Sequence, residues 1–81
     1  MNKHVADFYN KVIKQVQQWT IKPENVAREI WRNYYNAVLE EHNLTHNRLY
    51  LICKRAWRDT SVISWESYKN AIEYIIKKNI Y

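Results

Sequence analysis

The densest group of chemically active side chains lies between residues 47 and 58. It mixes cations with one aromatic and one aliphatic side chain: Asn47, Arg48, Tyr50, Leu51, Lys54, Arg55 and Arg58. On a helix these positions share an outward face, with Tyr50 at its edge, because side chains three and four residues apart are neighbours. Guanidinium and ammonium groups bind phosphates and carboxylates, and apolar side chains anchor protein contacts. The spacing therefore predicts a surface that binds a nucleic acid or an acidic protein. The alternative is a solvated face whose cations lie near a helix C-terminus.

Residues that often serve catalysis or metal binding occur here in unfavourable arrangements. His42 and His46 are four residues apart beside Glu41, but an expected helix break between them removes the shared face that a metal-binding pair needs. Cys53, the single cysteine, falls on an apolar stripe and should be buried and unreactive. The chain has no glycine, so it lacks the usual loops for phosphates and dinucleotides. We therefore expect no catalytic residue, no metal, no cofactor and no enzymatic activity.

Aromatic residues make up 15% of the chain, more than a domain of this size is expected to bury completely. Three tryptophans lie on apolar stripes and are expected in the core: Trp19, Trp31 and Trp57. Trp65 lies at the edge of a stripe near a helix start, and we add it to the partner-binding residues. Four further rings lie off the main stripes or at the chain end: Tyr35, Tyr50, Tyr74 and Tyr81. Their expected exposure favours a binding surface, or a homodimer formed through Ile80 and Tyr81.

The elements that must position these residues are helices. Apolar residues recur every three or four positions through nearly the whole chain, which is typical of amphipathic helices. We expect four of them, at about residues 4–20, 23–42, 46–58 and 65–79. The connections are short, so consecutive helices should pack as neighbours. The predicted fold is a single all-α domain, residues 1–81, forming a compact helical bundle. The pattern leaves an up-down and an orthogonal arrangement open.

Similar signals mark three of the helix starts. Pro23 suits the first position of the second helix, and Thr45 and Ser64 are expected to cap the third and fourth. Each start also has two apolar residues at the spacing of a hydrophobic staple. The expected staple pairs are Ile21–Val26, Leu44–Leu49 and Ile63–Tyr68.

The composition limits the environment and the partners. The 81 residues carry a formal net charge of +5, which favours an anionic partner. The apolar runs are far shorter than the roughly 18–20 residues that span a bilayer, and the N-terminus has no secretory pattern. We therefore expect a cytoplasmic protein without a membrane partner. The abundance of Asn, Ile, Lys and Tyr, which have AT-rich codons, indicates an AT-rich genome. Low-GC bacteria, phages and mobile elements all fit this, and for a phage or a mobile element the location would be the host cytoplasm.

The residues permit two functional interpretations. The leading one is a non-enzymatic inhibitor or regulator that docks the basic, aromatic surface of residues 46–58 on a macromolecular partner. The alternative is a DNA-binding regulator in which residues 46–58 form the recognition helix of a helix-turn-helix. The short connection at residues 42–44 and Asn43, which tolerates a left-handed conformation, favour this alternative. His42 and Leu39 disfavour it, because they fall where that motif has an apolar residue and an alanine.

Overall fold

The computed structural model describes residues 2–80, and these form an all-α fold. Its helices are α1 (Lys3–Thr20), α2 (Glu24–Glu41), α3 (His46–Trp57) and α4 (Trp65–Lys78). Each helix lies within two residues of its predicted bounds, so the fold class and the helix positions are confirmed.

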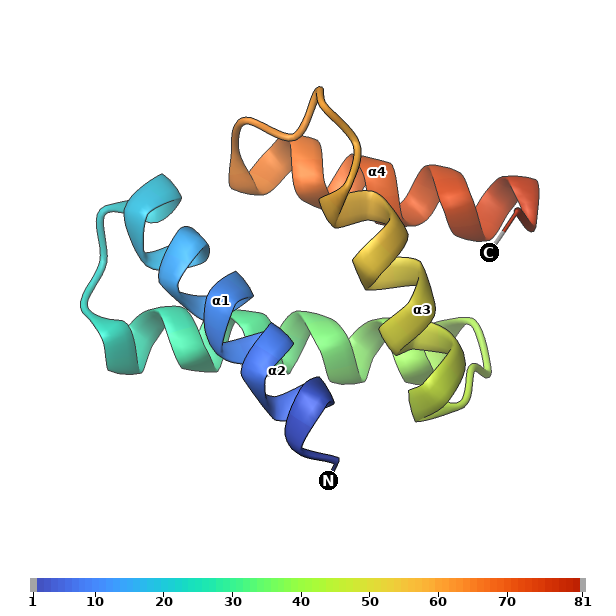
Figure 1. Cartoon of the computed structure of the whole chain (residues 1–81), viewed down its shortest axis with the longest axis horizontal. Coiled ribbons are helices and arrows are strands. Elements are labelled where there is room, and N and C mark those ends of the chain that lie inside the picture. The colour runs from blue at the N-terminus through green and yellow to red at the C-terminus, as the bar shows by residue number, and fades with distance from the viewer. Residues whose placement is uncertain (1, 81) are drawn as a thin grey trace.

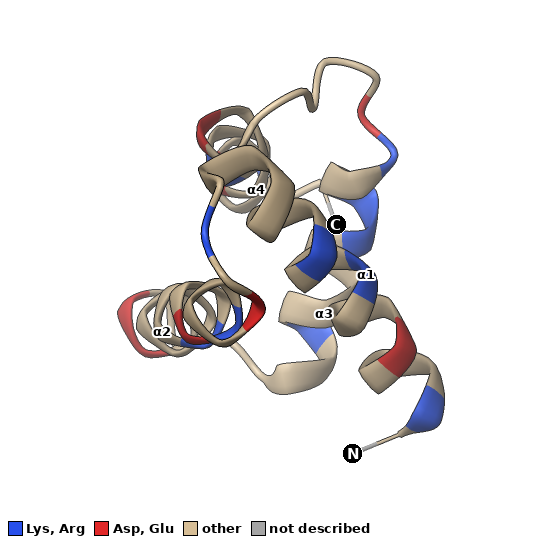
Figure 2. Ribbon diagram, turned by 90° about the vertical axis from the view of Figure 1, so that its left-hand side faces the viewer, with Lys and Arg blue, Asp and Glu red and all other residues tan. Residues whose placement is uncertain are grey.

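The helices form two crossed layers rather than an up-down bundle (Figure 1). α1 packs across α2, and α3 packs across α4. Seen from the side, α1 and α3 lie in one layer, with α2 and α4 in the other (Figure 2). The rings of Trp31 on α2 and Tyr68 on α4 stack with their centroids 5.9 Å apart, so two large side chains fill the space between these helices. The bulk of the aromatic core thus favours the crossed arrangement that the sequence left open.

The core draws on all four helices and is apolar throughout. Among the described residues, no charged or strongly polar side chain is buried. The buried residues are Tyr9, Val12, Ile13, Val16, Ala27, Trp31, Tyr35, Val38, Leu49, Ile52, Cys53, Ala56, Tyr68, Ile72 and Ile75. Within residues 2–80, no helix is long and apolar enough to cross a membrane.

Two of the predicted helix starts are confirmed. The Thr45 hydroxyl accepts a hydrogen bond from the Arg48 amide at 3.1 Å. The Ser64 hydroxyl accepts one from the Ser67 amide at 3.0 Å, and the Ser67 hydroxyl accepts one from the Ser64 amide at 2.9 Å, which completes a capping box. Pro23 is the N-cap of α2 rather than its first helical residue.

Two of the predicted staples are wrong. Ile21 is 89% exposed and Ile63 is 80% exposed, so neither packs against its expected partner in the following helix. Ile21 adopts a left-handed conformation at the end of α1, with φ at 54°, and this turn directs its side chain into solvent. Leu44 does pack against the core, which includes Leu49, in keeping with the predicted Leu44–Leu49 staple.

The chain makes its left-handed turns without glycine. Asn43 and Asn79 adopt φ values of 52° and 57°, and asparagine tolerates this region better than most residues. A β-branched residue tolerates it poorly, so Ile21 stores backbone strain at the end of α1.

Replacing Ile21 by asparagine should therefore stabilise the protein. We expect the free energy of unfolding to rise by about 0.5–1 kcal/mol, because the strain is relieved and almost no packing is lost at an exposed position. Urea unfolding followed by circular dichroism measures this change. Ile21→Val keeps the β-branch and should leave the stability near that of the native chain. Equal stabilities for Ile21→Asn and Ile21→Val would show that the turn is not strained.

Candidate partner-binding surface

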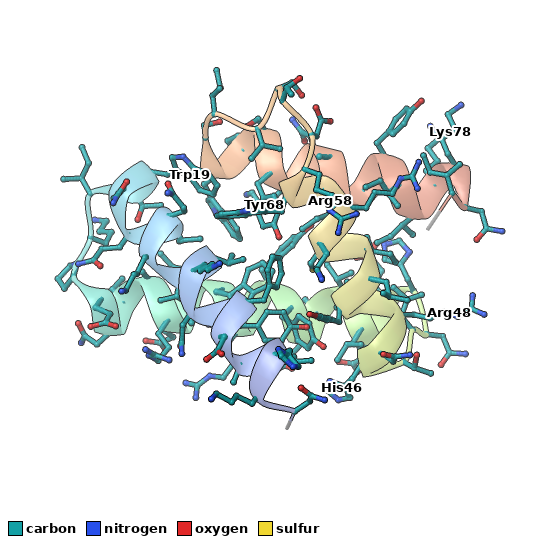
Figure 3. The ribbon with its side chains drawn as sticks, in the orientation of Figure 1. Trp19, His46, Arg48, Arg58, Tyr68 and Lys78 are labelled. Carbon is teal, nitrogen blue, oxygen red and sulfur yellow. The ribbon has the colours of Figure 1, made fainter. Side chains whose placement is uncertain are left out.

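The outer side of α3 gathers most of the residues predicted to bind a partner. Asn47, Arg48, Leu51 and Arg55 are exposed, as is Arg58 directly after the helix, and Lys54 is half-buried. We call these six residues the α3 basic face. They share one side of the helix because Leu49, Ile52, Cys53 and Ala56 occupy the buried side. Arg48 and Arg58 mark the two ends of this face, more than two helical turns apart (Figure 3).

Tyr50 lies beside this face rather than on it. Its ring is half-buried against Phe8 of α1, with the centroids 5.7 Å apart, and lies 6.1 Å from the ring of Tyr9. The Lys54 ammonium lies 5.3 Å from the centroid of the Tyr50 ring. Tyr50 therefore joins α3 to α1 and contacts Lys54. Because the Tyr50 ring is half-buried, the apolar side chain that the α3 basic face presents to a partner is Leu51, which is 51% exposed.

Trp65 lies elsewhere in the fold. Its half-buried ring packs edge-on against Tyr34 at 5.3 Å and against Trp31 at 6.2 Å, both on α2. The Lys69 ammonium covers the ring at 5.3 Å. These contacts place Trp65 at the α2–α4 contact, so we separate it from the α3 basic face.

Charge is distributed unevenly among the helices, and α2 is the acidic one. From Asn43 to Arg58 the chain has no acidic residue, and the exposed residues of α1 include Lys3, Lys11 and Lys14. α2 carries four exposed glutamates against two arginines: Glu24, Glu29, Glu40 and Glu41 against Arg28 and Arg32. Figure 2 shows mostly Lys and Arg positions along α1 and α3, with an acidic position also on α1, and acidic positions on more than one side of α2. One side of the molecule is therefore suited to an anionic partner, and the other is not.

The α2–α3 connection shares some features with a helix-turn-helix and lacks others. Val38, Leu49 and Ile52 are buried, and Asn43 adopts the expected left-handed conformation. However, α3 packs chiefly on α4. His46, which would lie at the start of a recognition helix, has its Nδ1 3.1 Å from the Tyr35 hydroxyl on α2. His42 is exposed, so it adds no apolar contact between the two helices.

The remaining tyrosines depart in part from expectation. Tyr35 is buried, contrary to its predicted exposure, because its ring packs against Tyr9 at 5.2 Å and its hydroxyl reaches His46. Tyr74 is 56% exposed and Ile80 is 42% exposed, as their positions off the stripe suggested. Tyr81 lies outside the described residues.

Cys53 is buried as predicted, and burial raises the pKa of its thiol well above the usual range. The Tyr68 hydroxyl donates a hydrogen bond to the Cys53 carbonyl oxygen at 3.0 Å, which ties α4 to α3. Within the described residues, no three His, Cys, Asp or Glu side chains come together as a metal site requires.

A concavity of about 430 Å³ lies between α1 and α2, and the sequence analysis did not predict it. Buried rings of Tyr9, Trp31 and Tyr35 form its floor, and Arg28 and Arg32 lie at its edge. Arg28 already pairs with Glu24 at 3.2 Å. The Tyr9 hydroxyl lies beside that of Tyr35 but makes no hydrogen bond of good geometry. This concavity has fewer cations than the α3 basic face, with Arg28 and Arg32 against four there.

No protein-family model, curated protein or solved structure matches this chain.

Proposed function

We propose that this chain is a non-enzymatic binding protein that docks the α3 basic face on an acidic surface of a protein partner. The observation that carries the proposal is the separation of charge, with four cations on an acid-free segment and the glutamates of α2 on another side. Complementary charge raises the association rate and selects the partner. A rigid helical face at this site needs little reordering on binding, which favours affinity.

Leu51 favours a protein over a nucleic acid as the partner. Its side chain is half exposed among four cations, and its exposed part gains free energy only when an apolar surface covers it. Protein interfaces place such an apolar centre inside a charged rim. Phosphate groups would engage the cations and leave Leu51 in water.

The small size of the chain favours an inhibitor or a regulator, which acts by covering a surface of a larger protein. The abundance of residues with AT-rich codons agrees with an origin in a phage or a mobile element. The place of action in this proposal is the host cytoplasm.

Affinity capture from a host lysate, with and without nuclease, tests the proposal. We expect the tagged protein to retain one defined protein partner after nuclease treatment, because the contact is between proteins. Binding should weaken only moderately from 50 to 200 mM salt, since apolar burial is not screened. Loss of every partner on nuclease treatment would contradict the proposal.

DNA binding is the second candidate, favoured by the turn at Asn43 and the buried Val38, Leu49 and Ile52 beside it. In this case α3 would enter the major groove, with its cations on phosphates. The logarithm of the affinity would then fall with the logarithm of the salt concentration, with a slope of about −0.9 for each phosphate contacted. A duplex titration at several salt concentrations distinguishes this candidate from the first.

A further inference from the structure

A second concavity, of about 400 Å³, borders the α3 basic face where the end of α3 meets the second half of α4. Its apolar wall comes from Ala71, Tyr74, Ile75 and Ile80. Its basic edge comes from Arg55 and Arg58, which also belong to the α3 basic face. We call these six residues, together with the concavity they line, the α3–α4 groove.

The end of α4 shapes the apolar wall. Asn79 adopts the left-handed conformation, and the Ile80 amide then donates to the Ile75 carbonyl at 3.4 Å. This pairing is that of a Schellman motif, which brings the residue after the turn back towards Ile75 in the last turn of the helix. Ile80 therefore lies back towards Ile75 and remains 42% exposed.

The groove combines exposed apolar side chains with cations. Tyr74 and Ile80 are two of the few large hydrophobic side chains that the described part of the chain leaves open to solvent. The Lys78 ammonium lies 5.9 Å from the centroid of the Tyr74 ring, which adds a positive charge to this side. Asp59 also lies at the groove, but its Oδ1 accepts hydrogen bonds from the amide and the hydroxyl of Ser61, at 2.9 and 2.8 Å.

We infer that the α3–α4 groove binds an acidic amphipathic segment of the protein partner. One apolar side chain of that segment would enter between Tyr74 and Ile80, and carboxylates beside it would pair with Arg55 and Arg58. Arginine and tyrosine around an apolar centre are the residue types that dominate protein interfaces. This inference rests on the proposed function, since the groove and the α3 basic face share both arginines.

A second copy of the chain fits the groove less well. The acidic element of this protein is α2, and none of the large exposed hydrophobic residues in the described part belongs to it. α2 thus offers carboxylates without the apolar side chain that the groove requires.

Selection from a random-peptide display library tests the inference, with the native protein immobilised. We expect enrichment of peptides that carry Asp or Glu around apolar residues spaced three or four positions apart. A synthetic peptide of the enriched sequence should bind the Tyr74→Ala variant at least about tenfold more weakly than the native protein. The reason is that the apolar wall of the groove loses its largest side chain. Ile63→Ala removes an apolar side chain outside the groove that is even more exposed than Tyr74, and it should leave the affinity unchanged.

Several outcomes would overturn the inference. These are no enrichment, enrichment without acidic residues, or equal affinities of the native protein and Tyr74→Ala. Loss of a native homodimer in Tyr74→Ala, measured by light scattering, would assign the groove to self-association. Loss of binding to an oligothymidine in the same variant would assign it to a nucleic acid.

The selection also separates this inference from the proposed function. Binding of the peptide and of the captured partner that depends on Arg55 and Arg58 but not on Tyr74 would overturn the groove and leave the α3 basic face in place. A different result would overturn the proposed function alone. In that result the peptide binds Tyr74→Ala more weakly than the native protein, but replacement of Arg55 and Arg58 leaves capture of the partner unchanged.

Discussion

The variant Arg55→Glu/Arg58→Glu is expected to bind the captured partner at least about 100-fold more weakly than the native protein. Two attractive charges become repulsive within the proposed interface, and like charges placed against each other cost several kcal/mol. A 100-fold loss corresponds to about 2.7 kcal/mol. Both side chains are exposed, so the helical circular dichroism should remain native. Isothermal titration or biolayer interferometry with the purified partner measures the loss.

The matched control is Lys22→Glu/Arg32→Glu, which changes the net charge by the same amount outside α3. Both positions are exposed, Lys22 in the α1–α2 connection and Arg32 on α2. We expect its affinity to stay within about threefold of the native value, since only the long-range attraction is reduced. Equal losses in the two variants would show that net charge, and not the α3 basic face, governs binding.

Alkaline pH should unfold this protein cooperatively. Burial raises the pKa of Tyr68 and of Tyr9 far above the ordinary value, because an ionised phenol is poorly solvated in the core. The neighbouring Tyr35 hydroxyl raises the pKa of Tyr9 further. The folded state thus favours the neutral phenols, so this stabilisation is complete below about pH 10, the pKa of an unfolded tyrosine, and is lost as the pH rises above it.

The expected loss is steep. Each such group lowers the free energy of unfolding by about 1.4 kcal/mol per pH unit, so Tyr9 and Tyr68 together remove about 2.7 kcal/mol per unit above pH 10. Burial raises the pKa of the Cys53 thiol in the same direction, so a further decline starts near pH 9. A small domain has roughly 5 kcal/mol to lose, so we expect unfolding between about pH 11 and 12. Circular dichroism and tyrosinate absorbance, recorded together, measure it.

Two conservative variants test the role of Tyr68. Tyr68→Phe removes one buried phenol and should reduce the slope of stability against pH above pH 10 by about 1.4 kcal/mol per unit. The same variant loses the hydrogen bond to the Cys53 carbonyl and should cost about 1 kcal/mol at neutral pH. Tyr74→Phe alters an exposed ring and should leave the slope unchanged. Tyrosinate absorbance at pH 10.5 equal to that of the urea-unfolded chain, with the helices intact, would contradict the prediction.

Local chemistry made much of the fold predictable. Helix periodicity and caps are properties of neighbouring residues, so the bounds of all four helices and the Thr45 and Ser64 caps could be predicted. The same periodicity predicted that Cys53 is buried and that Arg48, Arg55 and Arg58 share one exposed face, and the structure confirms both predictions. It failed for Ile21 and Ile63, because a staple depends on the direction in which the chain enters a helix, and that direction follows from the preceding turn.

The positions of the helices, and the apolar face of each, could be predicted from the residue pattern. Which side chain packs against each aromatic ring depends on how the helices cross, and the pattern does not contain this information. In the folded chain, Tyr35 is buried against Tyr9 and His46, and Trp65 packs on α2. Tyr74 remains exposed. The cations of α3 lie apart from the glutamates of α2. The physical reason is that periodicity is set within one helix, whereas the fate of a side chain at the edge of a stripe depends on the crossing of helices far apart in the chain.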